Sequence, residues 1–366
     1  MPAAGRAAGR IGADRPVMLR VGVVGVGFGR AVHVPAFRAD ERCRVVGIGA
    51  ATAGRAREAA TALGIERAFD DWQELVASPD LDVVAIAVPP AVQPAVAEAA
   101  ARAGKHIFCE KPAGAAVPQV ERMVAAVAAA RVTHGIDFFF PELDAWRKAK
   151  AVVEDGTLGR LHHATLSWHV ETFAHRARRD SWKLRHEMGG GTLNNFASHS
   201  LHYLEWLFGG IRRLAARLTP TGGAGDARVD AWLEFQSGLP VSLSIAADAF
   251  LGSGHRLEVY GEDGALVLAN PGPDYAEGFT LSLGTRGAPA LAPVATGAPA
   301  TGGDGRIAAV RSVARRFVDG IASGTAMTPN LHDGLRVQVL MAALREADGT
   351  GAWATPPPRR DRADHG

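Results

Sequence analysis

Two side chains that can transfer protons stand in settings that a surface residue would not usually occupy. Lys111 follows the apolar run of residues 106–109 and comes just before Pro112. The proline restricts Lys111 to an extended backbone, which fixes the direction in which its ammonium group projects. Burial lowers the pKa of a lysine, and such a group can donate a proton to an oxygen atom or accept one from it. Lys111 is therefore the first candidate for acid–base chemistry.

The second candidate follows the three consecutive glycines of residues 189–191. Asn195 and His199 are four residues apart, so they share one face if this segment is helical, and Tyr203 lies one turn further along. A histidine exchanges protons near neutral pH, which makes His199 a possible general acid or base. A structural histidine in the core would explain His199 as well, and that alternative stays open.

A glycine-rich turn directly follows the first apolar run of the chain. The turn consists of Gly25, Val26, Gly27, Phe28, Gly29 and Arg30. Glycines let a tight turn approach a pyrophosphate closely, and the helix that follows offers free N–H groups to that anion. In the pattern G-x-G-x-x-G the third glycine would fall at Arg30, whereas Gly29 stands one position early. Either the helix packs differently on the strand or Arg30 lies near a phosphate, and we expect a dinucleotide at this turn.

The end of the second apolar run discriminates between two nicotinamide cofactors. An acidic residue at this place would bind the ribose diol of NAD. Residues 49–55 contain no carboxylate, whereas Thr52 and Arg55 could hold a 2′-phosphate. The sequence therefore predicts NADP(H) in preference to NAD(H), although Arg55 could also be an ordinary solvated helix residue.

Residues 19–138 have the pattern of a Rossmann dinucleotide-binding domain of the α/β class. Short apolar runs alternate with Ala-rich helical segments, as expected for strands buried on both faces of a parallel sheet. The runs are residues 21–26, 44–49, 81–88, 106–109 and 132–136, and the helical segments are residues 55–63, 91–103 and 118–131.

Residues 139–348 have the pattern of an α+β domain with an open, largely antiparallel sheet, since several strand-like segments follow one another with short turns between them. These segments are residues 160–170, 212–218, 227–236, 239–247, 255–261 and 265–268, and helices are expected over residues 192–208 and 307–322. The Gly/Ala/Pro-rich residues 284–305 are expected to form a mobile loop. Residues 1–18 and 349–366 are expected to be disordered tails.

Composition excludes several classes of protein. The 366 residues are 47% hydrophobic and 21% charged, with a formal charge of +2, which fits neither disorder nor a membrane span. No basic stripe interleaved with aromatic residues indicates nucleic-acid binding. Cys43 and Cys109 are too few for a disulfide framework or a thiolate zinc site.

His162 and His163 are adjacent on an expected strand, so their side chains face opposite sides of the sheet and we predict no metal. The first 18 residues lack the apolar region of a secretory signal, and we expect a cytoplasmic location.

Four segments together resemble the Gfo/Idh/MocA family of oxidoreductases, over about residues 19–348. They are GVVGVGFGRAVHVPAF, DVVAIAVPP, AGKHIFCEKPAG and GGGTLNNFASHSLHYLEWLFG. The resemblance implies an NAD(P)-dependent enzyme that interconverts an alcohol and a carbonyl on a sugar, a cyclitol or a similar polyhydroxylated molecule. It also implies a homodimer or homotetramer formed through the C-terminal sheet. Relatives with other functions leave two alternatives: an NAD-dependent glycosidase that oxidises and eliminates, and a non-catalytic cofactor-binding regulator.

The resemblance also assigns roles to residues. It implies that Lys111 is catalytic and that His199 is a general acid or base. Asn195 stands where the family usually has an aspartate; an asparagine can orient the histidine ring but supplies no charge, so His199 should be the weaker base. The resemblance places Pro89 and Glu110 at the cofactor. Further residues that it places in the substrate pocket are Asp137, Trp182, Lys183 and Tyr203.

Overall fold

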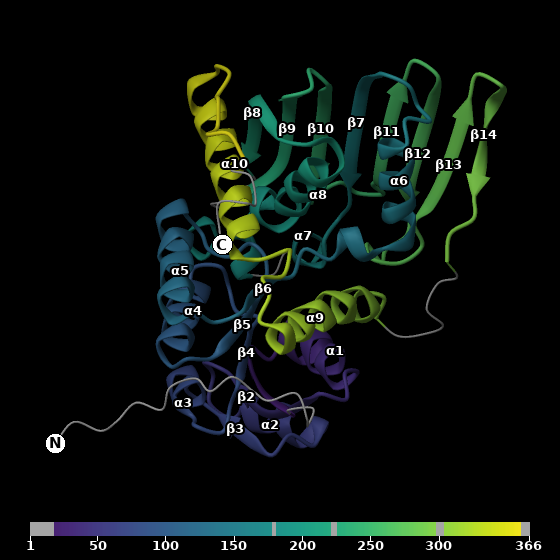
Figure 1. Cartoon of the computed structure of the whole chain (residues 1–366). Coiled ribbons are helices and arrows are strands. Elements are labelled where there is room, and N and C mark those ends of the chain that lie inside the picture. The colour runs from purple at the N-terminus through teal and green to yellow at the C-terminus, as the bar shows by residue number, and fades with distance from the viewer. Residues whose placement is uncertain (1–17, 178–180, 221–224, 298–303, 360–366) are drawn as a thin grey trace.

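A computed structural model describes residues 18–177, 181–220, 225–297 and 304–359 of the chain. Two sheets dominate it, a parallel sheet near the N-terminus and a larger sheet beyond it (Figure 1). None of the helices in these ranges is long and apolar enough to cross a bilayer. Residues 1–17 of the tail expected over residues 1–18, and residues 360–366 of the tail expected over residues 349–366, lie outside the described residues.

The first sheet is a six-stranded parallel sheet with the order β3-β2-β1-β4-β5-β6, which confirms the expected Rossmann domain. The order reverses beside β1, and ligands of such sheets bind at the carboxyl ends of the strands next to that point. One short strand, β3, was not anticipated from the sequence. The strands are β1 (Leu19–Val24), β2 (Cys43–Gly49), β3 (Arg67–Phe69), β4 (Val83–Ile86), β5 (His106–Cys109) and β6 (His134–Ile136).

Helices connect these strands, and each α-helix buries apolar residues on one side. In α4, for example, Val96, Ala97, Ala100 and Ala101 are buried at the spacing of one helical face. The helical segments are the π-helical turn η1 (Gly29–His33), α1 (Val34–Arg38), α2 (Arg55–Leu63), α3 (Trp72–Ala77), α4 (Gln93–Arg102) and α5 (Val117–Ala130).

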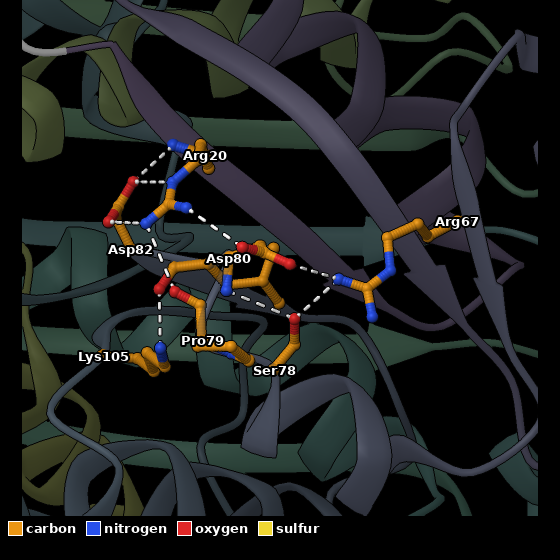
Figure 2. Close-up of polar contacts among 8 residues, drawn as sticks. Arg20, Arg67, Ser78, Pro79, Asp80, Asp82 and Lys105 are labelled. Atoms are coloured by element: carbon orange, nitrogen blue, oxygen red, sulfur yellow. Dashed lines mark hydrogen bonds and ion pairs between the residues drawn. The ribbon is translucent and has the colours of Figure 1, made fainter.

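A polar network ties the central strands together at their amino ends, opposite the glycine turn (Figure 2). The guanidinium of Arg20 in β1 donates to both carboxylate oxygens of Asp82 at 3.0 and 2.9 Å, and the backbone N–H of Arg20 donates to the same carboxylate at 2.9 Å. Lys105 Nζ, just before β5, donates to the carbonyl of Leu81 at 2.7 Å. Arg67 in β3 pairs with Asp80 at 2.9 Å. These bonds help to fix the relative register of the strands that carry the site at their other ends.

The second sheet has eight strands in the order β14-β13-β12-β11-β7-β10-β9-β8, and β7 and β10 form its one parallel pair among the described residues. This confirms the largely antiparallel sheet. Helices α6 (Asp144–Glu154) and α8 (Ser198–Phe208) lie over one face of it (Figure 1). The strands are β7 (Leu161–His169), β8 (Ile211–Pro220), β9 (Asp226–Phe235), β10 (Pro240–Ala246), β11 (Gly254–Gly261), β12 (Gly264–Asn270), β13 (Thr280–Thr285) and β14 (Ala288–Val294).

Residues 280–294 form a hairpin of β13 and β14, so the start of the expected mobile loop over residues 284–305 was placed wrongly. The low-complexity composition hid a strand because β14 is an edge strand. A proline such as Pro293 lacks an N–H group, and an edge strand tolerates this because one side of its backbone needs no partner strand.

The last two helices, α9 (Arg306–Ser323) and α10 (Leu331–Thr350), return to the first domain. Helix α9 packs against α1, β5 and β6, and α10 contacts α5 and β6 as well as β8 and α8. Beyond α10 the backbone of Ala354 pairs with Leu214 of β8 in both directions, at 2.8 and 2.9 Å. Residues 349–359 therefore differ from the tail expected over residues 349–366. Because Ala354 pairs with a strand that is distant in the sequence, no local sequence pattern predicts this pairing.

Candidate active site

The glycine turn lies at the carboxyl end of β1, and each of its first two glycines meets a different requirement. Gly25 has a φ of +123°, and a Cβ there would lie 2.2 Å from the carbonyl oxygen of Ala87, so no other residue fits. A Cβ on Gly27 would meet no protein atom within 4 Å. The backbone of Gly27 is thus bare on its open side, which fits the close approach of a pyrophosphate.

Gly29 explains the irregular third position of the motif. A Cβ on Gly29 would lie 2.8 Å from Val23 Cγ1 and 3.2 Å from Ala87 Cβ. Gly29 therefore provides the close contact between helix and strand that the third glycine provides in the regular pattern. The side chain of Arg30 is exposed in the first turn of η1 and plays no part in that packing.

The loop after β2 holds the residues expected to choose between the cofactors. Thr52 and Arg55 are both exposed there, Arg55 as the first residue of α2. The structure adds a carboxylate to this loop, since the N–H of Gly54 donates to Asp70 Oδ1 at 3.0 Å. Asp70 follows β3, the strand that the sequence analysis missed, so its proximity to the end of β2 could not be foreseen.

Lys111 lies at the carboxyl end of β5 and its ammonium group projects into a cavity. Its Nζ donates to the backbone carbonyl of Asn195 at 2.9 Å. Burial lowers the pKa of Lys111 to about 8; the cations Lys183 and Arg306 act in the same direction, and the anion Glu110 opposes them. Near neutral pH the group is therefore close to the point at which it gains or loses a proton.

Helix α4 forms a hydrogen bond to the segment that carries Lys111. Gln93 Nε2 donates to the carbonyl of Pro112 at 2.7 Å, and the side chain of Gln93 is buried. Pro89 caps the start of the same helix, because its carbonyl accepts from the N–H of Val92 at 2.8 Å and of Gln93 at 3.2 Å. Both contacts fix the position of the residues that flank Lys111.

His199 begins the regular part of α8, just after the π-helical turn η5 (Leu193–Ala197). Neither ring nitrogen of His199 has a hydrogen-bond partner among the described residues, and the ring packs against the edges of Phe139 and Phe140. Burial, aided by the charge of Lys111, holds the pKa of His199 well below its ordinary value. His199 is thus a neutral imidazole in the cavity wall, and both of its ring nitrogens are buried without a hydrogen-bond partner among the described residues.

Asn195 does not orient the ring of His199, in contrast to the expectation from the motif. Its side-chain Nδ2 turns back and donates to the carbonyls of Gly191 at 2.8 Å and Lys183 at 3.2 Å. The asparagine therefore secures the glycine segment and, through its own carbonyl, the ammonium of Lys111.

A cavity of about 850 Å³ brings together residues that are far apart in the sequence. Lys111, Asn195, His199 and Lys183 all line it, as the sequence analysis expected of a shared site. Apolar and aromatic side chains form much of the remaining wall. They include Trp168, Phe173, Phe196, Phe250, Leu251 and Tyr275, of which Phe173, Phe250 and Leu251 are exposed.

Three residues expected in the substrate pocket lie elsewhere. Tyr203 is fully buried, and its hydroxyl bonds Ser200 Oγ and His255 Nε2 at 2.8 Å each, because one turn beyond His199 the helix faces the core. Trp182 is half-buried and does not line the cavity, although Lys183 beside it does. Asp137 is 1% exposed and lies beneath Lys111, next to Glu110, rather than in the cavity wall.

Arg306 is a site residue that the sequence analysis missed. It is the first residue of α9, and its guanidinium lies 5.1 Å from the ring centre of Phe28 and 5.8 Å from that of Tyr275. It forms an ion pair with Asp304 and lines the cavity. Arg306 thus connects the glycine turn with the cavity. No motif marks it, since it follows a low-complexity stretch.

Comparison with known proteins agrees with this geometry. A family model for the oxidoreductase family with an NAD-binding Rossmann fold matches residues 19–138, and the model for the GFO/IDH/MocA C-terminal domain matches residues 146–267. An uncharacterised oxidoreductase of Synechocystis sp. is 32% identical over 359 residues, covering 93% of this chain and 96% of the relative. Levoglucosan dehydrogenase of Pseudarthrobacter phenanthrenivorans is 27% identical over 390 residues, covering 93% and 98%. A solved structure of levoglucosan dehydrogenase in complex with NADH and L-sorbose has a TM-score of 0.83 at 26% identity, covering 93% and 99% of the two chains.

Proposed function

Because the chain belongs to the Gfo/Idh/MocA family of oxidoreductases, we propose that it interconverts an alcohol and a carbonyl group on a sugar, a cyclitol or a similar polyhydroxylated molecule. The observation that carries this proposal is Lys111, whose ammonium group enters the cavity at the carboxyl edge of the parallel sheet beside the glycine turn. The related levoglucosan dehydrogenase acts on a sugar of this kind, according to its name.

We assign the transfer of the proton of the reacting hydroxyl group to Lys111. When an alcohol is oxidised, the hydroxyl proton leaves together with the hydride, and a neutral amine can accept it. In the reverse direction the ammonium form donates a proton to the carbonyl oxygen. With a pKa of about 8, Lys111 populates both forms near neutral pH. His199, as a neutral imidazole in the same wall, orients the reacting oxygen by a hydrogen bond.

We place a nicotinamide dinucleotide over the glycine turn, where its ring takes or gives the hydride. The bare backbone at Gly27 supports this position, and Gly25 and Gly29 shape the turn. In our proposal Phe28 and Arg30 contact the cofactor from the start of η1. Pro89, Glu110 and Lys111 border it at the ends of β4 and β5.

We propose that this cofactor is NADP(H) rather than NAD(H), because residues 49–55 contain no carboxylate and Arg55 is exposed at the start of α2. Asp70 opposes this preference by placing a negative charge at the same loop. Titration of the protein with NADPH and NADH tests the proposal. Arg55→Ala should weaken NADPH binding and spare NADH, whereas Asp70→Asn should strengthen NADPH binding. Equal affinities of the unmodified protein for the two cofactors would refute the preference.

The cavity supports Lys183 as a contact for the substrate. Its side chain is exposed to the cavity on the same side as Lys111, and two cations there suit an oxygen-rich ligand. We propose that Lys183 and Tyr275 hold hydroxyl groups of the substrate. Burial raises the pKa of Tyr275 to about 12, which keeps its phenol neutral and able to donate.

A screen of sugars and cyclitols with NADP⁺, NAD⁺ and the reduced cofactors, followed by nicotinamide absorbance, tests the activity itself. Lys111→Ala should lower turnover far more than cofactor affinity. Release of a free sugar without net cofactor reduction would indicate the glycosidase reaction instead. Tight binding of cofactor and sugar without any turnover would indicate a regulator.

We also propose a homodimer or homotetramer formed through the face of the eight-stranded sheet that α6 and α8 leave open. The side chain of Trp232 in β9 is 62% exposed on this sheet. Small polar side chains such as Thr165, Ser242 and Ser244 lie on neighbouring strands. Light scattering should give a multiple of the chain mass, and Trp232→Glu should reduce the measured mass.

We propose a cytoplasmic location because Cys43 and Cys109 are buried free thiols, which suit a reducing compartment. Cell fractionation tests it.

A further inference from the structure

Three ionisable side chains meet in the interior behind Lys111. His33 comes from η1, Glu110 from the end of β5 and Asp137 from the end of β6. One ligand atom of each lies within 4.8 Å of the others, and His33 Nε2 is 3.0 Å from Glu110 Oε1. His33 and Asp137 are buried, and the side chain of Glu110 is 12% exposed. None of the three lines the cavity.

The carboxyl group of Asp137 is the unusual member of this cluster. Neither of its oxygens receives a hydrogen bond from a donor among the described residues. An ionised carboxylate buried without donors is strongly disfavoured, and two carboxylates this close cannot both ionise readily. A protonated carboxyl group removes both difficulties, because its O–H can donate to the neighbouring carboxylate.

Glu110 is the member of the pair that carries the negative charge. Burial raises the pKa of Glu110, but the hydrogen bond and charge of His33, the hydrogen bond with Asp137 and the charge of Lys111 together outweigh burial and lower it. The pKa of Asp137 moves the other way, since burial and the charge of Glu110 both raise it. Geometry and charge therefore agree on which carboxyl group keeps the proton.

We propose that Asp137 and Glu110 share one proton, and that the single negative charge of this pair keeps Lys111 in its working range of protonation. This inference rests on the proposed role of Lys111 in proton transfer. Asp137 and Glu110 act through Lys111 and are positioning residues. The groups that face Lys111 are Glu110, Asp137, Lys183, Arg306 and His199. Burial and the two cations favour the neutral amine, and the carboxyl pair opposes them.

The test measures Lys111 without requiring a substrate. The rate at which an acylating reagent labels Lys111, followed by peptide mass spectrometry across pH, gives the midpoint of its titration. Asp137→Asn replaces a neutral acid by a neutral amide, so the midpoint should move by less than about 0.3 unit. Glu110→Gln combined with Asp137→Asn removes the charge, and the midpoint should fall by about one unit or more, because a neighbouring opposite charge shifts a pKa by this amount.

Asp82→Asn serves as the matched control. Asp82 lies at the opposite edge of the sheet in the network with Arg20 (Figure 2), so this variant should leave the Lys111 midpoint unchanged. If Asp137→Asn alone lowers the midpoint as far as the double variant does, Asp137 is ionised and the proposal is refuted. A failure of the sugar screen would refute the proposed function but would not alter these titrations.

Infrared spectroscopy of the unmodified protein keeps the proposal testable even if the variants fold poorly. The carbonyl stretch of a protonated carboxylic acid should be present at pH 7, should shift in deuterium oxide, and should disappear in Asp137→Asn but persist in Asp82→Asn. Absence of this band in the unmodified protein would overturn the shared proton. So would one equivalent of bound metal that is lost in Asp137→Asn, because the three side chains would then be metal ligands.

Discussion

Replacing Gly27 by alanine should weaken cofactor binding at least tenfold while leaving the fold intact. The new Cβ would meet no protein atom within 4 Å, so the folded protein has room for it. It would project, however, from the backbone that we propose approaches the pyrophosphate. A hydrogen bond from a backbone N–H to a charged group contributes about 1.5–3 kcal/mol. Loss of one such bond corresponds to about a 10- to 150-fold weaker affinity.

Gly29→Ala is the matched control, with the opposite expectation. Its Cβ would lie 2.8 Å from Val23 Cγ1, and Val23 is fully buried and cannot move away. Overpacking of this kind costs about 1–3 kcal/mol. For proteins of about 150–250 residues each kcal/mol lowers Tm by about 2–4 °C, and the shift is smaller for a longer chain. Gly29→Ala should therefore have a lower Tm than the unmodified protein. Gly27→Ala should have the same Tm as the unmodified protein.

The assay pairs thermal melting of the two variants with fluorescence titration by NADPH and NADH. The reasoning is refuted if Gly27→Ala binds both cofactors within about twofold of the unmodified protein, since a tenfold loss corresponds to only about 1.4 kcal/mol. It is equally refuted if Gly27→Ala loses as much Tm as Gly29→Ala, because its Cβ would then meet protein rather than open space.

Three further predictions concern the proton chemistry and the fold. Alcohol oxidation should become faster as pH rises through about 8, because the neutral amine of Lys111 accepts the proton. Carbonyl reduction should become slower over the same pH range, because the ammonium form donates the proton. A flat kcat/KM profile in both directions would contradict this role. Asn195→Asp should lower Tm without raising activity, because it sets a carboxylate against two carbonyl oxygens that now receive hydrogen bonds; a gain in turnover would show that the side chain turns toward His199. Asp82→Ala should lower the free energy of unfolding by about 1 kcal/mol in a denaturant titration, the usual scale for a partly exposed ion pair, and no loss would mean that the network in Figure 2 is dispensable.

Features that depend on neighbours in the sequence were predictable. The glycine turn and Lys111 before Pro112 each combine a strand with a residue that follows it directly. Their chemistry is therefore encoded within a few positions. The parallel sheet was equally legible, because strands buried on both faces appear as continuous apolar runs.

Features that depend on distant contacts were not predictable. Asp70 reaches the loop after β2 only because β3 pairs with β2, and Arg306 reaches Phe28 only because α9 returns to the first domain. The direction of a side chain is similarly hidden. Asn195 and Tyr203 have the spacing of site residues, yet one bonds backbone carbonyls and the other faces the core.

The return of α9 to the first domain bears on how such proteins can diversify. The ring centre of Phe317 in α9 lies 5.6 Å from that of Phe108 in β5 and 6.4 Å from that of Phe37 in α1, so the interior of the first domain includes a helix that follows the whole second sheet in the sequence. If two related genes recombined at residue 138, the parallel sheet of one protein would be covered by helix α9 of the other. Segments can be exchanged without this mismatch only if recombination keeps the first domain and α9 together. Substrate preference is thus free to change by replacing an internal cassette, while the flanks are inherited together.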